Sequence, residues 1–459
     1  MNDSVSVEIN PLETDIFLER TIMLRETQFW SRAALADLQL RKLKRLVRHV
    51  ERTVPFYRDF MRKEGFSWTD IHNLGDLKRF PLIDKQTIQD AYEAFLPDGI
   101  DRTGLMSRTT GGSTGTPLTV FADLAFHARD KANTEHYMNV FGLDIFRHRS
   151  IRLYGDAIPA ELTARGQHWK MVDDRKLVMS CYAIARHTAP AYVEAIGSFA
   201  PTYIHTRPSA ILPLARYILE DGLPLACPIR YVFCDGEYVT AGQRRIIERA
   251  FQARLVNIYG HSEGCLVGHP CPFSDNLHFL PQVGILEFLD TAGHPVSGEG
   301  GRGELVATGF NNDVFPLIRY RTRDVGIMGG EACPCGRHYP ILREVEGRMQ
   351  DYVVDSHGGL VPLAPAVFNY NDMDWRGIRE FQVVQERPGA LHFLIQPEPD
   401  GWMTQSDSAE TLDMVVRRLS AILGDGFTIT AGLTDRIERT VLGKHRYLRQ
   451  YLDLNDRLE

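Results

Sequence analysis

The sequence predicts an α/β fold, with a large N-terminal domain of parallel or mixed sheets and helices and a small mobile α+β C-terminal domain. Short β-branched segments alternate with longer helical segments between residues 100 and 345. Near residue 347 this alternation gives way to a compact α+β pattern. A length of 459 residues is sufficient for more than one domain. We therefore expect domains over residues 1–346 and 347–459.

A helix is predicted over residues 35–50, where leucine and valine recur at steps of three and four. Pro55 is expected to end or kink it. Its basic residues, within 41–48, suit either a nucleic-acid patch or a solvated helix face, and the acidic chain favours the second. The apolar positions are Leu35, Leu38, Leu43, Leu46, Val47 and Val50.

The central part of the chain supplies most of the remaining predicted elements. The glycine-rich segment 295–303 predicts a turn before a strand at 304–310. A helix is expected near residues 408–423, beyond the predicted boundary. Further strands are predicted at 230–239, 254–260 and 283–290, and further helices at 209–222 and 241–253.

The composition excludes several classes of protein. The chain is 44% hydrophobic and 24% charged, which is ordinary for a globular protein. Its net charge of −7 argues against general nucleic-acid binding, which needs a basic face. No segment approaches the ~20 apolar residues of a membrane span, and the polar, acidic N-terminus does not resemble a secretory signal. Seven cysteines, an odd number, favour a reducing compartment. We expect a cytoplasmic monomer or homodimer.

Residues 108–117 form a segment rich in glycine, serine and threonine, R-T-T-G-G-S-T-G-T-P. Consecutive small residues let backbone N–H groups turn toward one anion. The hydroxyls of Thr109, Thr110, Ser113 and Thr114 can donate to phosphate oxygens or reach a magnesium ion. Because no G-K-[ST] follows, this is not a Walker loop. Alone, such a segment is equally typical of a flexible loop.

Four more motifs follow this loop in order. They are Y-G-H-S-E at 259–263, R-Y-R-T-R-D at 319–324, E-G-R-M-Q-D at 346–351 and G-K at 443–444. The ordered set resembles the adenylate-forming superfamily of acyl-CoA synthetases, and within it the phenylacetate–CoA ligase and capsule-locus branch. The resemblance covers nearly the whole chain. Matching segments on that branch are L-V-R-H-V-E-R-T-V-P-F-Y-R from residue 46, F-P-L-I-D-K from residue 80 and C-P-C-G-R from residue 333.

The resemblance implies an AMP-forming acid ligase. Such an enzyme uses ATP and Mg²⁺ to activate a carboxylic acid as an acyl adenylate, releases pyrophosphate, and transfers the acyl group to CoA. The attack brings negative charges together, so the site must supply positive charge and fixed donors. One alternative is an amide ligase with an amine acceptor. The other is an adenylyltransferase or a non-catalytic nucleotide-binding protein of the same fold.

By resemblance, three residues would act in adenylation. Lys444 would bridge the substrate carboxylate and the α-phosphate. Glu263 would direct the magnesium ion, for which a hard oxygen ligand is suitable. Thr114 would donate its hydroxyl from the phosphate loop. Alternatively, Lys444 would be an exposed lysine in a turn, and Glu263 would be a surface carboxylate.

Other motif residues would contact the nucleotide. Tyr259 would lie against the adenine and Asp324 would accept the ribose hydroxyls, although Arg323 replaces the usual glycine before it. The alternative for Tyr259 is a tyrosine of the core, and the alternative for Asp324 is a structural salt bridge. His261 would be either a spacer or an acid–base group. The predicted contacts are Thr110, Gly111, Gly112, Ser113, Thr114, Gly115, Asp235, Gly236, Glu237, Tyr259, Gly260, Ser262, Asp324 and Arg348, with an interdomain hinge at Gln350 or Asp351.

Four residues are candidate zinc ligands: Cys271, His278, Cys333 and Cys335. Three thiolates and one imidazole make a closed tetrahedral set of the structural type. The C-x-C spacing is tighter than usual, but the resemblance supports the assignment, since several members of this branch carry a metal at corresponding positions. Buried free thiols are the alternative. Substitute ligands are Cys265, His269 and His338.

The acyl pocket is expected within residues 150–265. An aryl or hydrophobic acid is the default of the family, although the polar segment 200–208 also permits a polar substrate. Aromatic and apolar candidates are Tyr154, Trp169, Tyr182 and Tyr203, with Arg207 or His205 as carboxylate partners.

Overall fold

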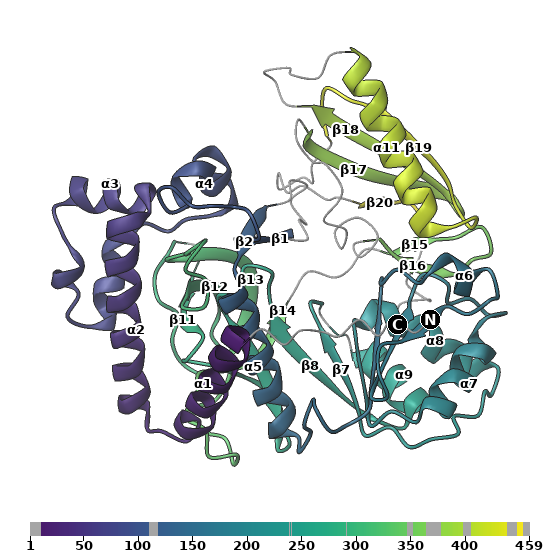
Figure 1. Ribbon diagram of the computed structural model, residues 1–459, viewed down its shortest axis with the longest axis horizontal. Coiled ribbons are helices and arrows are strands. Elements are labelled where there is room, and N and C mark those ends of the chain that lie inside the picture. The colour runs from purple at the N-terminus through teal and green to yellow at the C-terminus, as the bar shows by residue number, and fades with distance from the viewer. Residues whose placement is uncertain are drawn as a thin grey trace. The chain divides into compact units, whose positions relative to one another are not determined.

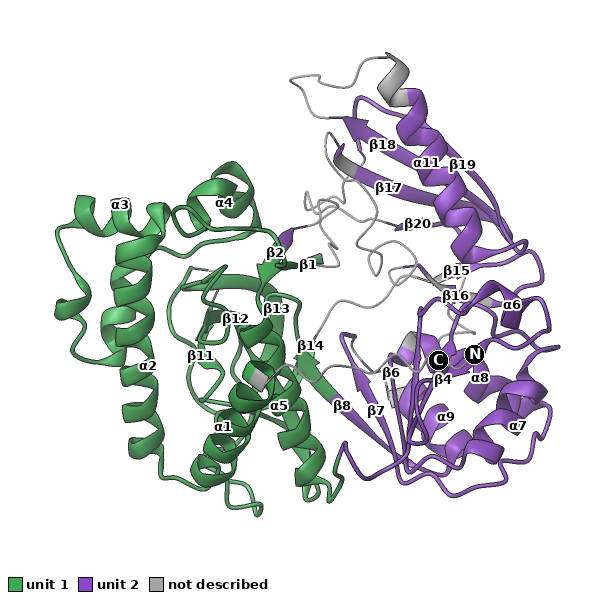
Figure 2. Cartoon of the chain, viewed as in Figure 1, with its two compact units in different colours: residues 1–108, 120–144, 258–347 green, residues 109–119, 145–257, 348–459 purple. Residues whose placement is uncertain are grey.

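The computed structural model describes residues 11–109, 118–237, 239, 241–290, 292–346, 352–363, 378–397, 405–437 and 448–452. The chain divides into two compact units, shown in Figure 2. Unit 1 comprises residues 1–108, 120–144 and 258–347, and unit 2 comprises residues 109–119, 145–257 and 348–459. Within the described ranges, no helix has the length and apolar character needed to cross a bilayer.

The helices of unit 1 begin with two long ones, α1 and α2. Ser31 caps α2 by accepting a hydrogen bond from the backbone N–H of Ala34, and Pro55 starts the next helix at its first position. Helices α1 and α5 lie side by side (Figure 1), and Arg20 Nε donates to Asn133 Oδ1 at 3.2 Å between them. The helices are α1 (Pro11–Thr27), α2 (Arg32–Thr53), α3 (Pro55–Glu64), α4 (Lys85–Asp90) and α5 (Leu124–Val140), with 3₁₀ turns η1 (Trp68–Asp70), η2 (Leu74–Arg79) and η3 (Tyr92–Phe95).

The main sheet of unit 1 has the order β11-β12-β13-β14-β10-β9-β8, with antiparallel neighbours. Two of the predicted motifs lie on this sheet: Y-G-H-S-E begins at the end of β8, and R-Y-R-T-R-D runs into β13. Its strands are β8 (Arg254–Gly260), which begins in unit 2, β9 (Val267–Cys271), β10 (Ser274–Phe279), β11 (Gly284–Leu289), β12 (Arg302–Gly309), β13 (Tyr320–Met328) and β14 (Ile341–Glu346). A separate pair, β1 (Met106–Thr109) and β2 (Thr119–Ala122), flanks the phosphate loop in sequence.

In unit 2 the neighbouring strands follow the order β7-β6-β3-β5-β4 and are mostly parallel. Strands β7, β6, β3 and β5 run parallel, and β4 pairs antiparallel with β5. Buried aliphatic residues of the strands pack with helices α7, α8 and α9. The elements are β3 (Ser150–Tyr154), α6 (Ala160–Thr163), β4 (Trp169–Met171), β5 (Lys176–Ser180), α7 (Ala189–Phe199), β6 (Tyr203–Thr206), α8 (Pro208–Glu220), β7 (Tyr231–Asp235) and α9 (Ala241–Phe251).

The C-terminal part of unit 2 is a small α+β structure. Its sheet has the order β19-β18-β17-β20, and α11 covers one face through Val415, Leu419 and Leu423 (Figure 1). The elements are β15 (Tyr352–Val354), β16 (Leu360–Pro362), β17 (Ile378–Arg387), β18 (Ala390–Pro397), α11 (Gln405–Leu423), β19 (Thr428–Leu433) and β20 (Leu448–Gln450).

The architecture confirms the predicted α/β class and its small C-terminal α+β part. The helix predicted at 35–50 is α2, and the helix predicted at 408–423 is α11. One boundary between the units falls at Gly347–Arg348, where the sequence pattern changes. The assignment of residues 347–459 as a separate moving lid stays a prediction.

Candidate active site and metal cluster

In unit 1, Tyr259 and Asp324 are joined directly. Tyr259 lies one residue before the end of β8 and donates its hydroxyl to Oδ2 of Asp324, on β13, at 2.8 Å. Burial and the Asp324 carboxylate raise the pKa of Tyr259 well above its usual value, so the hydroxyl keeps its proton. The two residues predicted to hold adenine and ribose are therefore neighbours.

Arg323, which stands where the motif usually has glycine, has an unusual backbone conformation. Arg323 has φ of +64°, in the left-handed region that favours glycine. Its side chain pairs with Asp84 at 2.8 Å. Strand β13 thus has, directly before Asp324, a backbone conformation that the usual glycine would also adopt.

Glu263 lies in the turn after β8 and is only 7% exposed. Tyr320 donates its hydroxyl to Oε1 at 2.7 Å, and Oε2 lies 2.9 Å from Nδ1 of His261. Burial alone would raise the pKa of Glu263, but the hydrogen bonds from His261 and Tyr320 lower it to about 2. The site therefore holds an ionised carboxylate at neutral pH.

The tautomer of His261 follows from its second contact. Its Nε2 accepts a hydrogen bond from the backbone N–H of Leu266 at 3.2 Å. A nitrogen that accepts carries no proton, so Nδ1 bears the hydrogen and donates it to Glu263. Both ring nitrogens are thus used, which makes His261 a support for Glu263. Gly260 and Ser262 flank it, each partly exposed.

In unit 2, Asp235 ends strand β7 and is followed by Gly236 with φ of +72°. Its Oδ2 accepts from the Tyr154 hydroxyl at 2.8 Å and lies 3.0 Å from Nε2 of His205. The backbone oxygen of the next carboxylate residue, Glu237, accepts from the side-chain amide of Asn257 at 3.3 Å.

The four predicted zinc ligands are brought together in unit 1. Their donor atoms all lie within 4.8 Å of one another. Sγ of Cys271 is 3.6 Å from Sγ of Cys333, and Sγ of Cys335 is 3.4 Å from Nε2 of His278. Zn–S bonds of about 2.3 Å and Zn–N bonds of about 2.1 Å at tetrahedral angles give edges of about 3.8 Å and about 3.6 Å. The set therefore has the size of a tetrahedral zinc site.

The surroundings of the cluster favour ligation. Nδ1 of His278 lies 3.1 Å from the carbonyl oxygen of Asn276, which leaves Nε2 directed at the thiols. Burial lowers the pKa of His278, so the ring is neutral, as a metal ligand must be. Burial opposes ionisation of Cys335, but the backbone N–H and guanidinium of Arg337 lower the pKa of this thiol.

All seven cysteines are free thiols. Cys265 and His269 are buried in unit 1, but they are not members of the four-residue cluster, and among the described residues neither these two nor His338 joins a metal-ligating group.

Several predicted residues lie outside the described ranges. They are the phosphate-loop residues Thr110, Gly111, Gly112, Ser113, Thr114 and Gly115, with Arg348, Gln350, Asp351 and Lys444. Their roles stay predictions.

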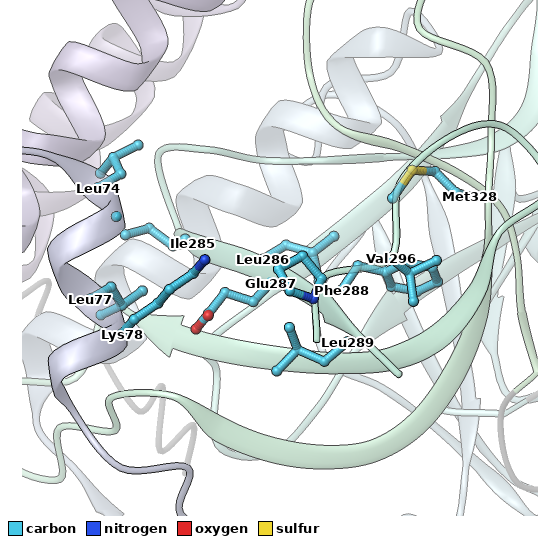
Figure 3. Close-up of a pocket in the computed structure, with 12 residues that line it drawn as sticks. Leu74, Leu77, Lys78, Ile285, Leu286, Glu287, Phe288, Leu289, Val296 and Met328 are labelled. Atoms are coloured by element: carbon cyan, nitrogen blue, oxygen red, sulfur yellow. The ribbon is translucent and has the colours of Figure 1, made fainter. Parts of the chain in front are cut away.

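A cavity of about 380 Å³ opens elsewhere in unit 1, between η2 and strand β11 (Figure 3). Leucine, isoleucine, valine and phenylalanine side chains line it, together with Lys78 and Glu287. Glu287 is bound by Arg319 at 3.0 Å. None of the predicted nucleotide or metal residues contributes to its wall.

Sequence reasoning missed the partners that hold Glu263 and Asp235. Tyr320 lies inside the R-Y-R-T-R-D motif, but only Asp324 was assigned a role there. Tyr154 and His205 were considered for the acyl pocket, yet both contact Asp235. Alternating strand positions give no signal for such pairs, because they depend on which strands become neighbours.

The chain is similar to several curated proteins over about 70% of its length. It is 29% identical to the phenylacetate–coenzyme A ligase of Thermus thermophilus over 353 residues, covering 72% of this chain and 74% of the relative. It is 26% identical to the phenylacetate–coenzyme A ligase of Pseudomonas putida over 341 residues, covering 70% and 72%. It is 22% identical to protein CapK of Staphylococcus aureus over 334 residues, covering 71% of each chain. No protein-family model matches the sequence.

Solved structures share the fold. A 2-hydroxyisobutyryl-CoA ligase in complex with 2-HIB-AMP and CoA superposes with a TM-score of 0.61 at 19% identity, covering 93% of this chain and 92% of that one. The same ligase in its postadenylation state gives a TM-score of 0.57 at 18% identity, covering 95% and 94%. At this identity the likeness concerns the fold. In motifs, relatives and fold, the chain resembles the adenylate-forming superfamily, and within it the phenylacetate–coenzyme A ligase-like branch.

Proposed function

We propose that this protein activates a carboxylic acid with ATP as an acyl adenylate, releases pyrophosphate, and transfers the acyl group to CoA. The observation that carries the proposal is the arrangement in unit 1. An ionised, buried Glu263 is held by two donors, and Asp324 is fixed by Tyr259, all within motifs that occur in the order of the family. The named CoA ligases among the relatives support the same activity.

Each carboxylate can bind its proposed partner beside the hydrogen bonds that orient it. A carboxylate offers about four lone-pair positions, so accepting a hydrogen bond from a protein donor is compatible with binding a further group. Asp324 can accept ribose hydroxyls while Tyr259 keeps the carboxylate oriented. Glu263 is suited to Mg²⁺, which prefers hard oxygen ligands and would neutralise phosphate charge when bound.

The remaining adenylation residues lie outside the described ranges, so their roles rest on the resemblance. The loop 110–117, with Thr114, would hold the departing phosphates through backbone N–H groups and hydroxyls. Arg348 would lie near the nucleotide. Lys444 would stabilise the charge that moves between the acid and the α-phosphate, an effect confined to the transition state.

We also propose that the four-residue cluster in unit 1 binds one structural zinc ion. The supporting observations are the tetrahedral donor separations, the neutral His278 and its Asn276 anchor. Four protein ligands leave no open position, so the ion would stabilise the fold and not the reaction. Free thiols and thiolate ligation suit a reducing cytoplasm.

The test is a pyrophosphate-release assay with a panel of aryl, aliphatic and amino acids, run with CoA, with simple amines and with no acceptor. We expect release that depends on both ATP and one class of acid, and turnover that CoA accelerates. Acceleration by an amine instead would assign the amide-ligase alternative. Retention of AMP on the product would assign an adenylyltransferase. ATP binding without acid-dependent release from any panel member would contradict catalysis.

A further inference from the structure

The carboxyl ends of three parallel strands in unit 2 carry an unusual polar cluster. Tyr154 ends β3, Asp235 ends β7, and His205 lies one residue before the end of β6. Thr206 pairs with Leu153 on one side and Cys234 on the other, so Tyr154 and Asp235 both follow the same register position. In open α/β sheets, ligands bind beyond the carboxyl ends of the strands.

Asp235 is held at one oxygen only. Both of its hydrogen bonds, from the Tyr154 hydroxyl at 2.8 Å and the His205 ring at 3.0 Å, fall on Oδ2. Within the part of the chain that the structure describes, no donor lies on Oδ1. The side chain is 32% exposed, so this oxygen is accessible. The carboxylate is thus fixed in orientation with one acceptor atom open.

The electrostatic surroundings keep Asp235 charged. Burial alone would raise its pKa, but the His205 and Tyr154 bonds and the nearby Arg207 guanidinium lower it. Arg207 lies close to the ring of Tyr154, 5.5 Å from its centroid, and the charges of Asp235 and Glu237 raise the pKa of Arg207. Asp235, Glu237 and Arg207 together carry a net negative charge, so a second substrate carboxylate would be repelled.

The loops around the cluster are tightly packed. A Cβ on Gly155, directly after β3, would overlap the hydroxyl of Tyr182. Two of the aromatic residues expected to line an apolar pocket, Tyr154 and Tyr182, therefore have their hydroxyls at this edge. An ionised Asp235 beside a purely apolar acid would lose hydration without gaining a partner, which is costly.

We infer that the acid substrate of this protein carries a hydrogen-bond donor, a hydroxyl or an amino group, that binds Oδ1 of Asp235. The inference rests on the proposed function, because it identifies the acid of that reaction. Asp235 directly precedes the Gly236-Glu237 pair that the resemblance assigns to adenine. The donor group of the substrate would therefore bind beside the nucleotide, where the acid must lie in order to react.

The test compares matched acids that differ in one group: an unsubstituted acid, its hydroxy derivative and its amino derivative. Acid-dependent exchange of labelled pyrophosphate into ATP is measured for each, and kcat/KM values are compared. A site built to hydrogen-bond a substrate group can reject the analogue lacking it by about 10⁴-fold. We expect at least about a 100-fold preference for a donor-bearing acid, and the hydroxy and amino arms identify the donor.

Two Asp235 variants test the residue itself. Asp235→Gly, which removes the whole side chain, should reduce the preference to below about 10-fold. Asp235→Asn preserves the shape of the side chain but removes its charge. This variant should reduce the preference for the amino derivative more than the preference for the hydroxy derivative. Asp221→Asn, at the end of α8 where Asp221 pairs with Arg186, should leave the preference unchanged.

Two results would overturn the inference while leaving the proposed function intact. The first is exchange with the unsubstituted acid that equals or exceeds exchange with both derivatives. The second is a preference that both Asp235 variants retain. Exchange with none of the acids, by folded protein that binds ATP, would instead contradict the proposed function and this inference with it.

Discussion

Replacing Tyr320 by phenylalanine removes a single hydroxyl, the one that donates to Oε1 of Glu263 at 2.7 Å. The acceptor is a buried carboxylate, and charge-assisted bonds of this kind are short and contribute about 1.5–3 kcal/mol. Phenylalanine keeps the ring volume, so no cavity is added. We therefore expect the Tyr320→Phe variant to lose about 1.5–3 kcal/mol of unfolding free energy at pH 7.

Tyr339 offers a matched control in the same unit. It is 1% exposed, compared with 4% for Tyr320, and its hydroxyl accepts a hydrogen bond from the neutral amide of Gln282 at 3.0 Å. A neutral bond contributes only about 0.5–1.5 kcal/mol, so Tyr339→Phe should cost less. Urea denaturation of both variants, with unchanged slopes, measures the difference. A Tyr320→Phe cost equal to or below that of Tyr339→Phe would refute the reasoning about Glu263.

Three further predictions concern charge, metal and catalysis. Because the pKa of Glu263 is lowered from 4.5 to about 2, its stabilisation is present above pH 4.5 and is lost as the pH falls toward 2. Unfolding free energies should therefore fall more steeply below pH 5 in wild type than in Glu263→Gln, whereas parallel pH curves would contradict an ionised native carboxylate. Elemental analysis of protein purified without chelator should find one zinc per chain and none in Cys333→Ser, whose melting temperature should be lower and insensitive to chelator; a metal-free, fully stable wild type would argue against the site. Lys444→Ala should retain ATP binding but slow adenylation by at least about 100-fold, because its charge acts in the transition state, and an unchanged rate would remove it from the site.

The elements that sequence predicted best are those with strong local signals. The leucine and valine spacing of α2, its serine cap and Pro55 determine where that helix begins and ends. The order of the motifs singled out Glu263 and Asp324 without knowledge of the strand order, because each lies in a short contiguous pattern that a single sequence displays directly. Cysteine and histidine chemistry singled out the four candidate zinc ligands, whose donor atoms the structure brings together.

The partners of Glu263 and Asp235 could be identified only from the three-dimensional arrangement. Tyr320 contacts Glu263 across 57 residues, and Tyr154 contacts Asp235 across 81. Such contacts depend on strand order and register, which local patterns leave open. Similarly, the positive φ of Arg323 could not be expected from an arginine, since its side chain gives no sign of a left-handed backbone.

The central claim is the formation of an acyl adenylate, and its most direct test is exchange of labelled pyrophosphate into ATP in the presence of an acid. We expect exchange that requires the acid, is lost in Asp324→Ala, and is accompanied by an acyl–AMP species detected by mass spectrometry after acid quench. Conversion of ATP to ADP, or label incorporation that is independent of any acid, would contradict the claim.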